Sequence, residues 1–434
     1  MARFKRWTSP RSMNDFPARL SHKEVLSMRH ARHSITAGLT RAVQVGVFAG
    51  LAAVVAGVTS APSALAAPAP AAPQNAKLPS TLASPKVYVF PMTGQMGTDV
   101  SKQLVDIMIE DIRKQKPDII VYHLKSADID RNNYLRNDDR EEFGMPAIEE
   151  YRDIVKRLHE DLRDIPQIMW VEDSVGFASL VALGWPDLYM KSDARLWGLS
   201  RVASMAQGWE DADVKSKMET AWTGIGKGIL QQGGYNLVLG DAMMFPDKQL
   251  SVRFKGREVE WLENTTGVWI VDGSGDATAN FDATLAEDVL LSDGTADTLD
   301  DLMFLLGYRE FAQVESGPKL AEQYVNDWRK AFERVQEWLT DLEQIEDPGT
   351  VGLGKRRAVL EKMLAALKQY PAIEARLGRR GINQTAIEIE IDNIKKDIQR
   401  IREAERGNRG NGGGGGGSGR PGLGGGGMGG RRGT

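Results

Sequence analysis

The chain of 434 residues contains no cysteine, which excludes disulfide bonds, thiolate nucleophiles and metal sites built on cysteine. It has five histidines, and three of them lie close to the N-terminus, at His22, His30 and His33. His123 and His159 remain for the rest of the chain, so we expect neither a histidine-rich metal site nor a cofactor. The net charge of −4 is too small to indicate nucleic acid as a partner.

The N-terminal segment has the three parts of an export signal. Basic residues dominate before Ala42, the uncharged apolar run AVQVGVFAGLAAVVAGV follows, and Ala64-Leu65-Ala66 fits a cleavage site of small residues. We therefore predict an exported protein, periplasmic or extracellular. Residues 1–66 form either a signal peptide or an uncleaved anchor that associates with the membrane, and Met28 is an alternative start. Residues 67–84 form an Ala/Pro linker.

Apolar runs alternate with helical patterns between residues 85 and 316. The strand-like runs are KVYVFPMTG, DIIVYHL and QIMWV, and helical spacing occurs in VSKQLVDIMIEDIRKQ and from Pro146 to about Asp164. This alternation predicts an α/β domain with a largely parallel, buried sheet. Further on, we expect a helix over Asp211–Gly233, short strands and turns over Tyr235–Thr278, and two helices within LAEDVLLSDGTADTLDDLMFLLG.

From Pro318 the apolar residues recur in steps of three and four, which predicts a helical hairpin or short coiled coil over residues 318–406. Such apolar stripes must be buried against another surface, so we expect a homo-oligomer. The tail, residues 407–434, is dominated by glycine, and we predict that it is a disordered tether. Its four scattered arginines lack the aromatic neighbours typical of an RNA-binding segment.

The segment WVEDSVGFASLVALGWPDLYM, which begins at Trp170, combines a strand end, a serine and an apolar helical run. A serine hydrolase needs a base beside its nucleophile and backbone N–H groups directed at the oxyanion. His123 and His159 do not lie in a recognisable triad context, so a lysine is the remaining candidate base. The predicted helix after Asp211 carries Lys215, Lys217 and Lys227, and each of them taken alone is better explained as a solvated side chain on an exposed face.

The order of these elements resembles the ClpP/crotonase fold. Within it, the chain is similar to the membrane-associated serine peptidases of the signal peptide peptidase A and NfeD type. The similarity rests on ALGWPDLYMKSDARLWG, residues 182–198, and most specifically on Leu285–Gly307, and it covers about residues 86–315. The resemblance implies a spiral of ββα units, assembly into oligomers and, in active members, a Ser/Lys dyad.

The chain departs from this family at both parts of the catalytic machinery. The resemblance places the nucleophile at Gly176 or Phe177, and neither side chain can attack a carbonyl. The position of the oxyanion loop reads Ser126-Ala127-Asp128-Ile129, without the pair of glycines that lets the backbone approach closely. We therefore predict a catalytically degenerate protein that binds peptide or membrane-protein segments.

The alternative is an active serine endopeptidase. In this case a displaced Ser174 is the nucleophile, and Lys217 or Lys215 is the base. A purely structural interpretation of this segment is that Asp173 or Ser174 caps the following helix and that the Ser179 hydroxyl donates a hydrogen bond to a backbone carbonyl.

The loop Asp128–Asp139, DIDRNNYLRNDD, has oxygen-bearing side chains at the spacing of an EF-hand. Asn133 stands where the EF-hand has glycine, and a strand rather than a helix precedes the loop. We interpret the segment as an acidic, solvated loop that holds no metal and covers the pocket, and calcium binding is the alternative.

Overall fold

The computed structural model describes residues 76–78, 84–127, 148–204, 209–256 and 258–410. The chain divides into two compact units, Met1–Pro68 and Ala69–Thr434, and all described residues belong to the second. The predictions for residues 1–66, for most of the linker, for the Asp128–Asp139 loop and for most of the glycine-rich tail lie outside the described residues.

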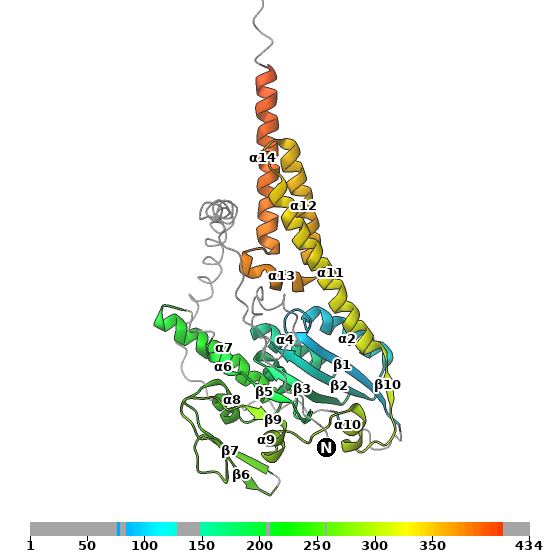
Figure 1. Ribbon diagram of the computed structural model, residues 1–434, viewed down its shortest axis with the longest axis vertical. Helices are drawn as coiled ribbons and strands as arrows, with labels where there is room; N and C mark the ends of the chain where they lie inside the picture. The colour runs from blue at the N-terminus through cyan, green and yellow to red at the C-terminus, as the bar shows by residue number, and fades with distance from the viewer. Residues whose placement is uncertain (1–75, 79–83, 128–147, 205–208, 257, 411–434) are drawn as a thin grey trace, which may run out of the picture. The chain divides into compact units, whose positions relative to one another are not determined.

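A seven-stranded sheet forms the centre of the α/β region (Figure 1). Its order is β10-β1-β2-β3-β5-β9, and β4 pairs with β3. All of these neighbours are parallel except β5 and β9. The predicted mixed α/β architecture with a largely parallel sheet is confirmed. The strands are β1 (Lys86–Gln95), β2 (Ile119–Ala127), β3 (Gln167–Val175), β4 (Leu188–Met190), β5 (Arg195–Trp197), β9 (Phe281–Asp282) and β10 (Ala312–Val314).

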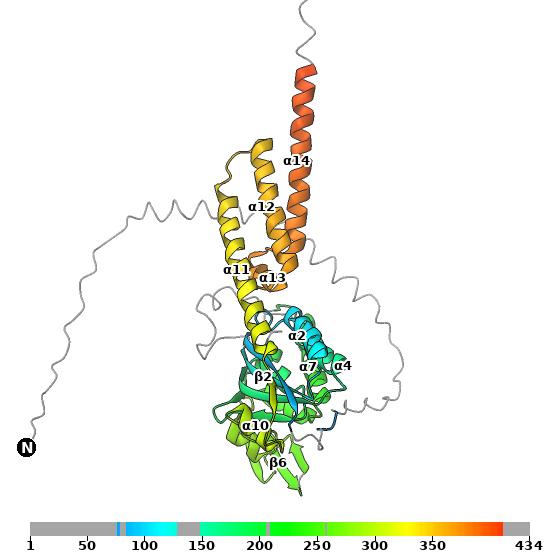
Figure 2. The same ribbon diagram turned by 90° about the vertical axis from the view of Figure 1, so that its right-hand side faces the viewer.

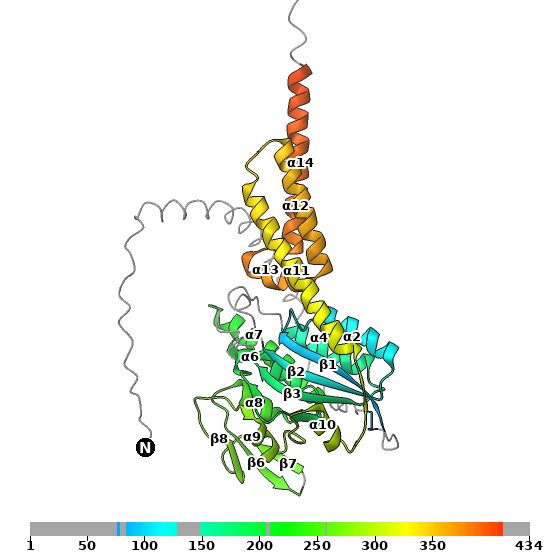
Figure 3. The ribbon, with the colours of Figure 1, turned by 45° about the vertical axis from the view of Figure 1, so that its right-hand side comes forward.

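Helices cover both faces of this sheet (Figures 1 and 3). Alternate residues of β1 and β2, such as Tyr88 and Tyr122, join α2, α4 and α5 in the larger apolar cluster. The residues between them, such as Val87 and Val121, pack against α10 in a smaller one. The period of two along each strand therefore divides its side chains between two cores. The helices are α2 (Lys102–Gln115), α4 (Ile148–Asp161), α5 (Phe177–Ala182), α6 (Ser200–Ser204), α7 (Ala212–Gln232), α9 (Ala283–Asp288) and α10 (Leu299–Leu305).

The predicted strand region Tyr235–Thr278 also contains a helix. α8 (Leu237–Met244) starts at Asn236, whose side chain accepts a hydrogen bond from the Val238 N–H. Its sequence, LVLGDAMM, is apolar on nearly all sides, so it lacks the amphipathic period by which a helix is recognised. The strands β6 (Leu250–Lys255), β7 (Glu258–Leu262) and β8 (Trp269–Asp272) follow and form a separate antiparallel sheet in the order β7-β6-β8.

Four α-helices and one short 3-10 helix occupy the C-terminal region (Figure 2). α12 packs against both α11 and α14, and the beginning of α11 packs on β1 and α2. The predicted apolar positions Trp328 and Phe332 on α11, and Ile387 and Ile391 on α14, are buried. Within the described residues, no helix is long and apolar enough to cross a membrane. The elements are α11 (Ser316–Gln344), α12 (Thr350–Gln369), α13 (Pro371–Leu377), η2 (Gly378–Arg380) and α14 (Gln384–Gly410).

We expect the contact between α11 and β1 to depend on Gly317. A Cβ atom at this position would lie 2.3 Å from the carbonyl oxygen of Val89, so Gly317→Ala should displace the helix and lower the free energy of unfolding by about 1–3 kcal/mol. Gly354→Ala is the matched control in α12, because a Cβ there meets nothing within 4 Å and should stabilise the helix by about 0.5–1 kcal/mol. Urea unfolding followed by circular dichroism measures both, and equal effects would contradict the expectation.

Candidate functional site

The carboxyl ends of the parallel strands place four residues in one row. Gly94 of β1 pairs with Ser126 of β2, Ser126 pairs with Ser174 of β3, and Ser174 pairs with Leu196 of β5. Ser126 is the first residue of the predicted oxyanion loop, and Ser174 is the nucleophile of the alternative prediction. In open parallel sheets, ligands bind at this edge.

Ser174 is fully buried, and its hydroxyl bonds within the protein. It donates to the carbonyl oxygen of Arg195 at 2.9 Å and lies 3.0 Å from the hydroxyl oxygen of Ser179. The Ser179 hydroxyl is equally buried and lies 3.2 Å and 3.1 Å from the carbonyl oxygens of Ser174 and Trp197. The expected backbone bond of Ser179 is therefore present. Both hydroxyls join β3, α5 and β5, and neither faces solvent.

The turn from β3 into α5 is made by Gly176. Its φ of 74° and ψ of −134° belong to a region that glycine adopts far more readily than other residues. Its N–H donates to the carbonyl oxygen of Trp197 at 2.8 Å, and a Cβ on Gly198 would lie 3.1 Å from the same nitrogen. Phe177 follows as the first residue of α5, fully buried and in edge contact with the Tyr151 ring.

The expectation that Asp173 or Ser174 caps this helix is wrong. The strand β3 extends to Val175, and Gly176 is the N-cap, without a side-chain hydrogen bond. Asp173 instead forms an ion pair with Arg195 at 2.7 Å, and Arg195 lies over the half-exposed Trp197 ring. Asp173 and Ser174 have side chains that could cap a helix, but the pairing of β3 with β5 keeps both residues in the strand.

The candidate lysines lie on α7. Lys217 is exposed in the first half of this helix, and the contact with α5 is made further on, where Gly226 approaches Leu180. Nine residues of helix correspond to about 13 Å along its axis. A general base must lie within hydrogen-bond reach of its nucleophile, and the hydrogen bonds of Ser174 involve neither Lys215 nor Lys217. Lys227 forms an ion pair with Asp241 at 2.6 Å. The structure therefore does not bring Ser174 and Lys217 together.

His159, one of the two histidines outside the N-terminal segment, has a structural environment. Its Nε2 lies 2.8 Å from the carbonyl oxygen of Gly184, and its ring stacks on Trp185. Burial lowers the pKa of His159, so the neutral ring is favoured at neutral pH. It contacts neither Ser174 nor Gly176.

A polar cluster that the sequence analysis missed surrounds Glu172 on β3. The carboxylate accepts hydrogen bonds from His123 Nε2 at 2.9 Å, from Lys191 Nζ at 2.7 Å and from Lys125 Nζ. Trp170 supports the cluster, because His123 stacks on its ring and Lys191 Nζ lies 5.1 Å from its centroid. These side chains project from the face opposite the larger apolar cluster and remain partly exposed. In the sequence, His123 and Lys125 lie two residues apart in a predicted strand, so they share one face, and this polar face is the signal that indicates the cluster.

The electrostatics of the cluster suit binding better than proton transfer. The hydrogen bond from His123, followed by those from Lys125 and Lys191, holds the pKa of the Glu172 carboxyl well below its ordinary value, while burial acts in the opposite direction. An ionised carboxylate with such a low pKa is a poor general base. Two lysines and a histidine meet at this one carboxylate, and Asp297 lies near Lys191.

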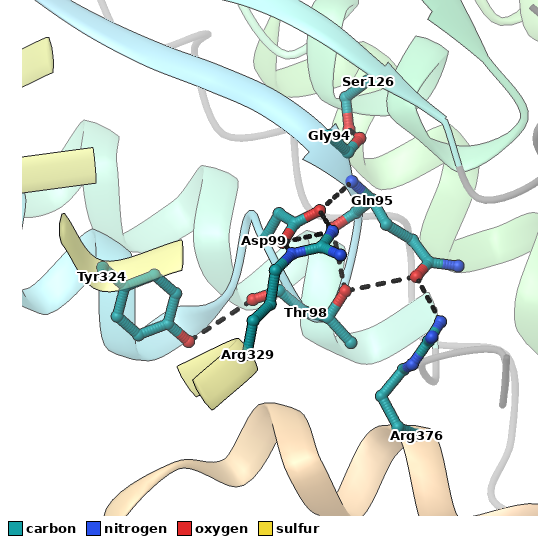
Figure 4. A network of polar contacts seen from close by, with 8 residues as sticks. All are labelled: Gly94, Gln95, Thr98, Asp99, Ser126, Tyr324, Arg329 and Arg376. Atoms are coloured by element: carbon teal, nitrogen blue, oxygen red, sulfur yellow. Dashed lines mark hydrogen bonds and ion pairs between the residues drawn. The ribbon is translucent and has the colours of Figure 1, made fainter. Parts of the chain in front are cut away.

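A buried network joins the end of β1 to the C-terminal helices (Figure 4). Asp99 is 3% exposed, and its carboxylate pairs with Arg329 of α11 at 2.8 Å and accepts the Gln95 N–H at 3.0 Å. Arg376 of α13 is 1% exposed and donates to Gln95 Oε1 at 3.1 Å. The Tyr324 hydroxyl, from α11, contacts the Ser101 hydroxyl at 2.6 Å and the Thr98 carbonyl oxygen.

This network adjoins the row of strand ends directly. The Ser126 hydroxyl donates to the Gly94 carbonyl oxygen at 2.8 Å, and a Cβ on Gly94 would lie 2.4 Å from Asp99 Oδ2 (Figure 4). Helices α11 and α13 therefore contact the β1 end of the site, while the Glu172 cluster and Trp197 stay partly exposed. In the part of the chain that the structure describes, no group of three or more acidic or histidine side chains is placed to hold a metal ion.

Glu172 should stabilise the fold in a pH-dependent way. Because its pKa is lowered on folding, its contribution is present above the unfolded value of about 4.5 and is lost as the pH falls further. We expect Glu172→Gln to cost about 1.5–3 kcal/mol at pH 7 and to reduce the loss of stability between about pH 4.5 and 2. Urea titrations across this range test it against Glu160→Gln, whose exposed pair with Lys156 at 3.8 Å should contribute about 0–1 kcal/mol.

The Asp99–Arg329 pair should couple strongly, because either change alone leaves a buried charge without its partner. We expect Asp99→Asn and Arg329→Gln each to cost about 3–5 kcal/mol, and the double variant to cost clearly less than the sum. The exposed pair Lys102–Asp153 serves as the control cycle and should show a coupling of about 0–1 kcal/mol. Additive losses at Asp99 and Arg329 would contradict a direct pair.

No protein-family model matches the chain, and no curated protein matches it significantly. Among solved structures, the chain is similar to the 1510-N membrane-bound stomatin-specific protease in complex with a substrate peptide. The identity is 16%, the match covers 51% of this chain and 80% of that one, and the TM-score is 0.31. The 1510-N membrane protease specific for a stomatin homolog from Pyrococcus horikoshii matches at 15% identity over 50% and 77%, with a TM-score of 0.31. A peptidase from Plasmodium falciparum matches at 11% identity over 48% and 96%, with a TM-score of 0.29. Two of these three solved structures are named as proteases and one as a peptidase, and each match covers about half of this chain.

Proposed function

We propose that the protein is a non-hydrolytic member of the ClpP/crotonase-like serine peptidases that binds peptide or membrane-protein segments. One observation carries the proposal: the turn from β3 into α5 is made by Gly176, whose N–H bonds to the Trp197 carbonyl and which has no side chain to attack a substrate. The protein keeps the strand, the turn and the helix that would present a nucleophile, without the nucleophile.

The surroundings of the turn support this proposal. A nucleophilic hydroxyl must be accessible and must lie beside a base. Ser174 and Ser179 are fully buried, and their hydroxyls bond to each other and to main-chain carbonyls. Lys217 is exposed on α7, about 13 Å along the helix from the contact with α5. These contacts favour the non-hydrolytic function over the Ser/Lys peptidase that uses Ser174.

The exposed part of the strand ends supports a binding role. Trp197 is 42% exposed beside Arg195, and Glu172 pairs with Lys125 of β2 and with Lys191, which follows β4. An exposed tryptophan near arginine and lysine side chains suits a polypeptide with apolar and acidic side chains. Export, membrane association through residues 1–66 and assembly into a homo-oligomer belong to the same proposal and rest on the sequence patterns.

Fluorescein-labelled casein, an acidic and largely unfolded polypeptide, tests binding and hydrolysis together. We expect the full chain to raise the anisotropy of the probe without cleaving it, and Lys125→Glu with Lys191→Glu to weaken this binding about tenfold. Ser174→Ala should leave binding unchanged and should lower the free energy of unfolding by about 1–3 kcal/mol, because a buried hydrogen-bond donor is lost.

Two results would contradict the proposal. Cleavage of the probe, or labelling by a fluorophosphonate, that disappears in both Ser174→Ala and Lys217→Ala would establish the Ser/Lys peptidase instead. Binding that persists in the Lys125→Glu, Lys191→Glu variant would place the polypeptide site elsewhere. Lys156→Glu with Lys368→Glu, two exposed lysines outside the site, provides the matched charge control.

A further inference from the structure

A groove of about 380 Å³ is lined by residues of α11 and α12. Figure 2 shows these two helices side by side. The lining of the groove includes three small residues, Ala331, Ala365 and Ala366, and the partly exposed Trp338. The size falls within the usual range of binding pockets. Small lining residues allow another backbone to approach closely, and a partly exposed tryptophan is a frequent anchor for a partner.

The charges on the groove are unbalanced. Lys330 and Arg334 of α11 and Lys362 of α12 line it, against a single acid, Asp327. All three cations are exposed, and none forms an ion pair or hydrogen bond with another described residue, whereas Arg357 and Lys368 on α12 each pair with a glutamate. Lys330 and Arg334 lie one helical turn apart, a spacing at which like charges destabilise a helix slightly. The lining of the groove therefore carries a net positive charge.

We propose that this groove binds an acidic amphipathic helix of a partner polypeptide. The α11 side of the groove runs from Asp327 to Trp338, which is eleven steps of the helix, or about 16 Å, and corresponds to three turns of a bound helix. Carboxylates at positions i and i+4 of such a helix are spaced about 6 Å apart and match Lys330 and Arg334. Its apolar stripe covers the alanines and Trp338, which is the usual mode of helix binding in a groove.

The charge complementarity selects this occupant. A neutral apolar helix would leave three cations partly desolvated without partners, and a basic helix would be repelled. The groove is lined by residues of α11 and α12 and by Tyr370, which follows α12, so this inference does not rest on the function proposed for the strand ends.

A labelled synthetic peptide of about 15 residues, with a leucine stripe flanked by glutamates at i and i+4, is the probe. We expect the full chain to bind it saturably, to lose about tenfold in affinity between about 0.05 and 0.5 M salt, and to bind the glutamine version at least tenfold more weakly. Trp338 fluorescence should change on binding, and Trp338→Phe should remove that signal.

The discriminating variant is Lys330→Glu with Arg334→Glu, which should reduce affinity at least tenfold and leave helicity by circular dichroism unchanged, because both side chains are exposed. Lys319→Glu with Lys355→Glu makes the same change in net charge at exposed positions of α11 and α12 outside the groove and should retain binding. Retention of peptide binding by the groove variant, or equal binding of the glutamine peptide, overturns the proposal.

Two other occupants give distinct results. The groove would be a lipid site if the chain sedimented with phosphatidylglycerol vesicles, if the groove variant did not, and if the peptide did not bind. The groove would be an interface between copies of the chain if the chain self-associated, if the same variant did not, and if the peptide did not bind. Either result replaces the proposed partner.

Discussion

Parallel pairing of β1, β2 and β3 is the constraint on which the site depends. It brings the carboxyl ends of three strands to one edge, so that Gly94, Ser126 and Ser174 lie in a single row although they are distant in the sequence. Because successive side chains of a strand point to opposite faces of the sheet, neighbouring residues at this edge lie in different environments. Hydroxyls such as that of Ser174 are buried, and the Glu172 cluster stays partly open to solvent.

The ionised groups near this edge are matched rather than isolated, because an unpaired charge is costly to bury. Asp99 faces Arg329, Asp173 faces Arg195, and Glu172 is surrounded by cations. The first pair also fixes the position of α11 over the end of β1, and Arg376 adds a contact from α13. One end of the row is therefore in contact with the C-terminal helices, and Trp197 at the other end is partly exposed.

The sequence predicted the central strands and the flanking helices well, because each has a strong apolar period. It did not predict the end of β3, since Asp173 and Ser174 have side chains that serve equally in a strand or in a helix cap. Residues of β5, some twenty positions later, decide between the two by pairing with Ser174 and by placing Arg195 beside Asp173. α8 was missed because a helix that is apolar all round has no period to detect.

The sequence by itself determined that no cysteine chemistry is available, and the family resemblance predicted Gly176 or Phe177 at the position of the nucleophile. These are properties of single residues and need no neighbours. The tertiary structure alone decided that Ser174 is enclosed, that Lys217 lies away from it, and that His123, Lys125 and Lys191 converge on Glu172. Each of these depends on pairing or packing between distant segments, and local sequence carries no record of which segments will meet.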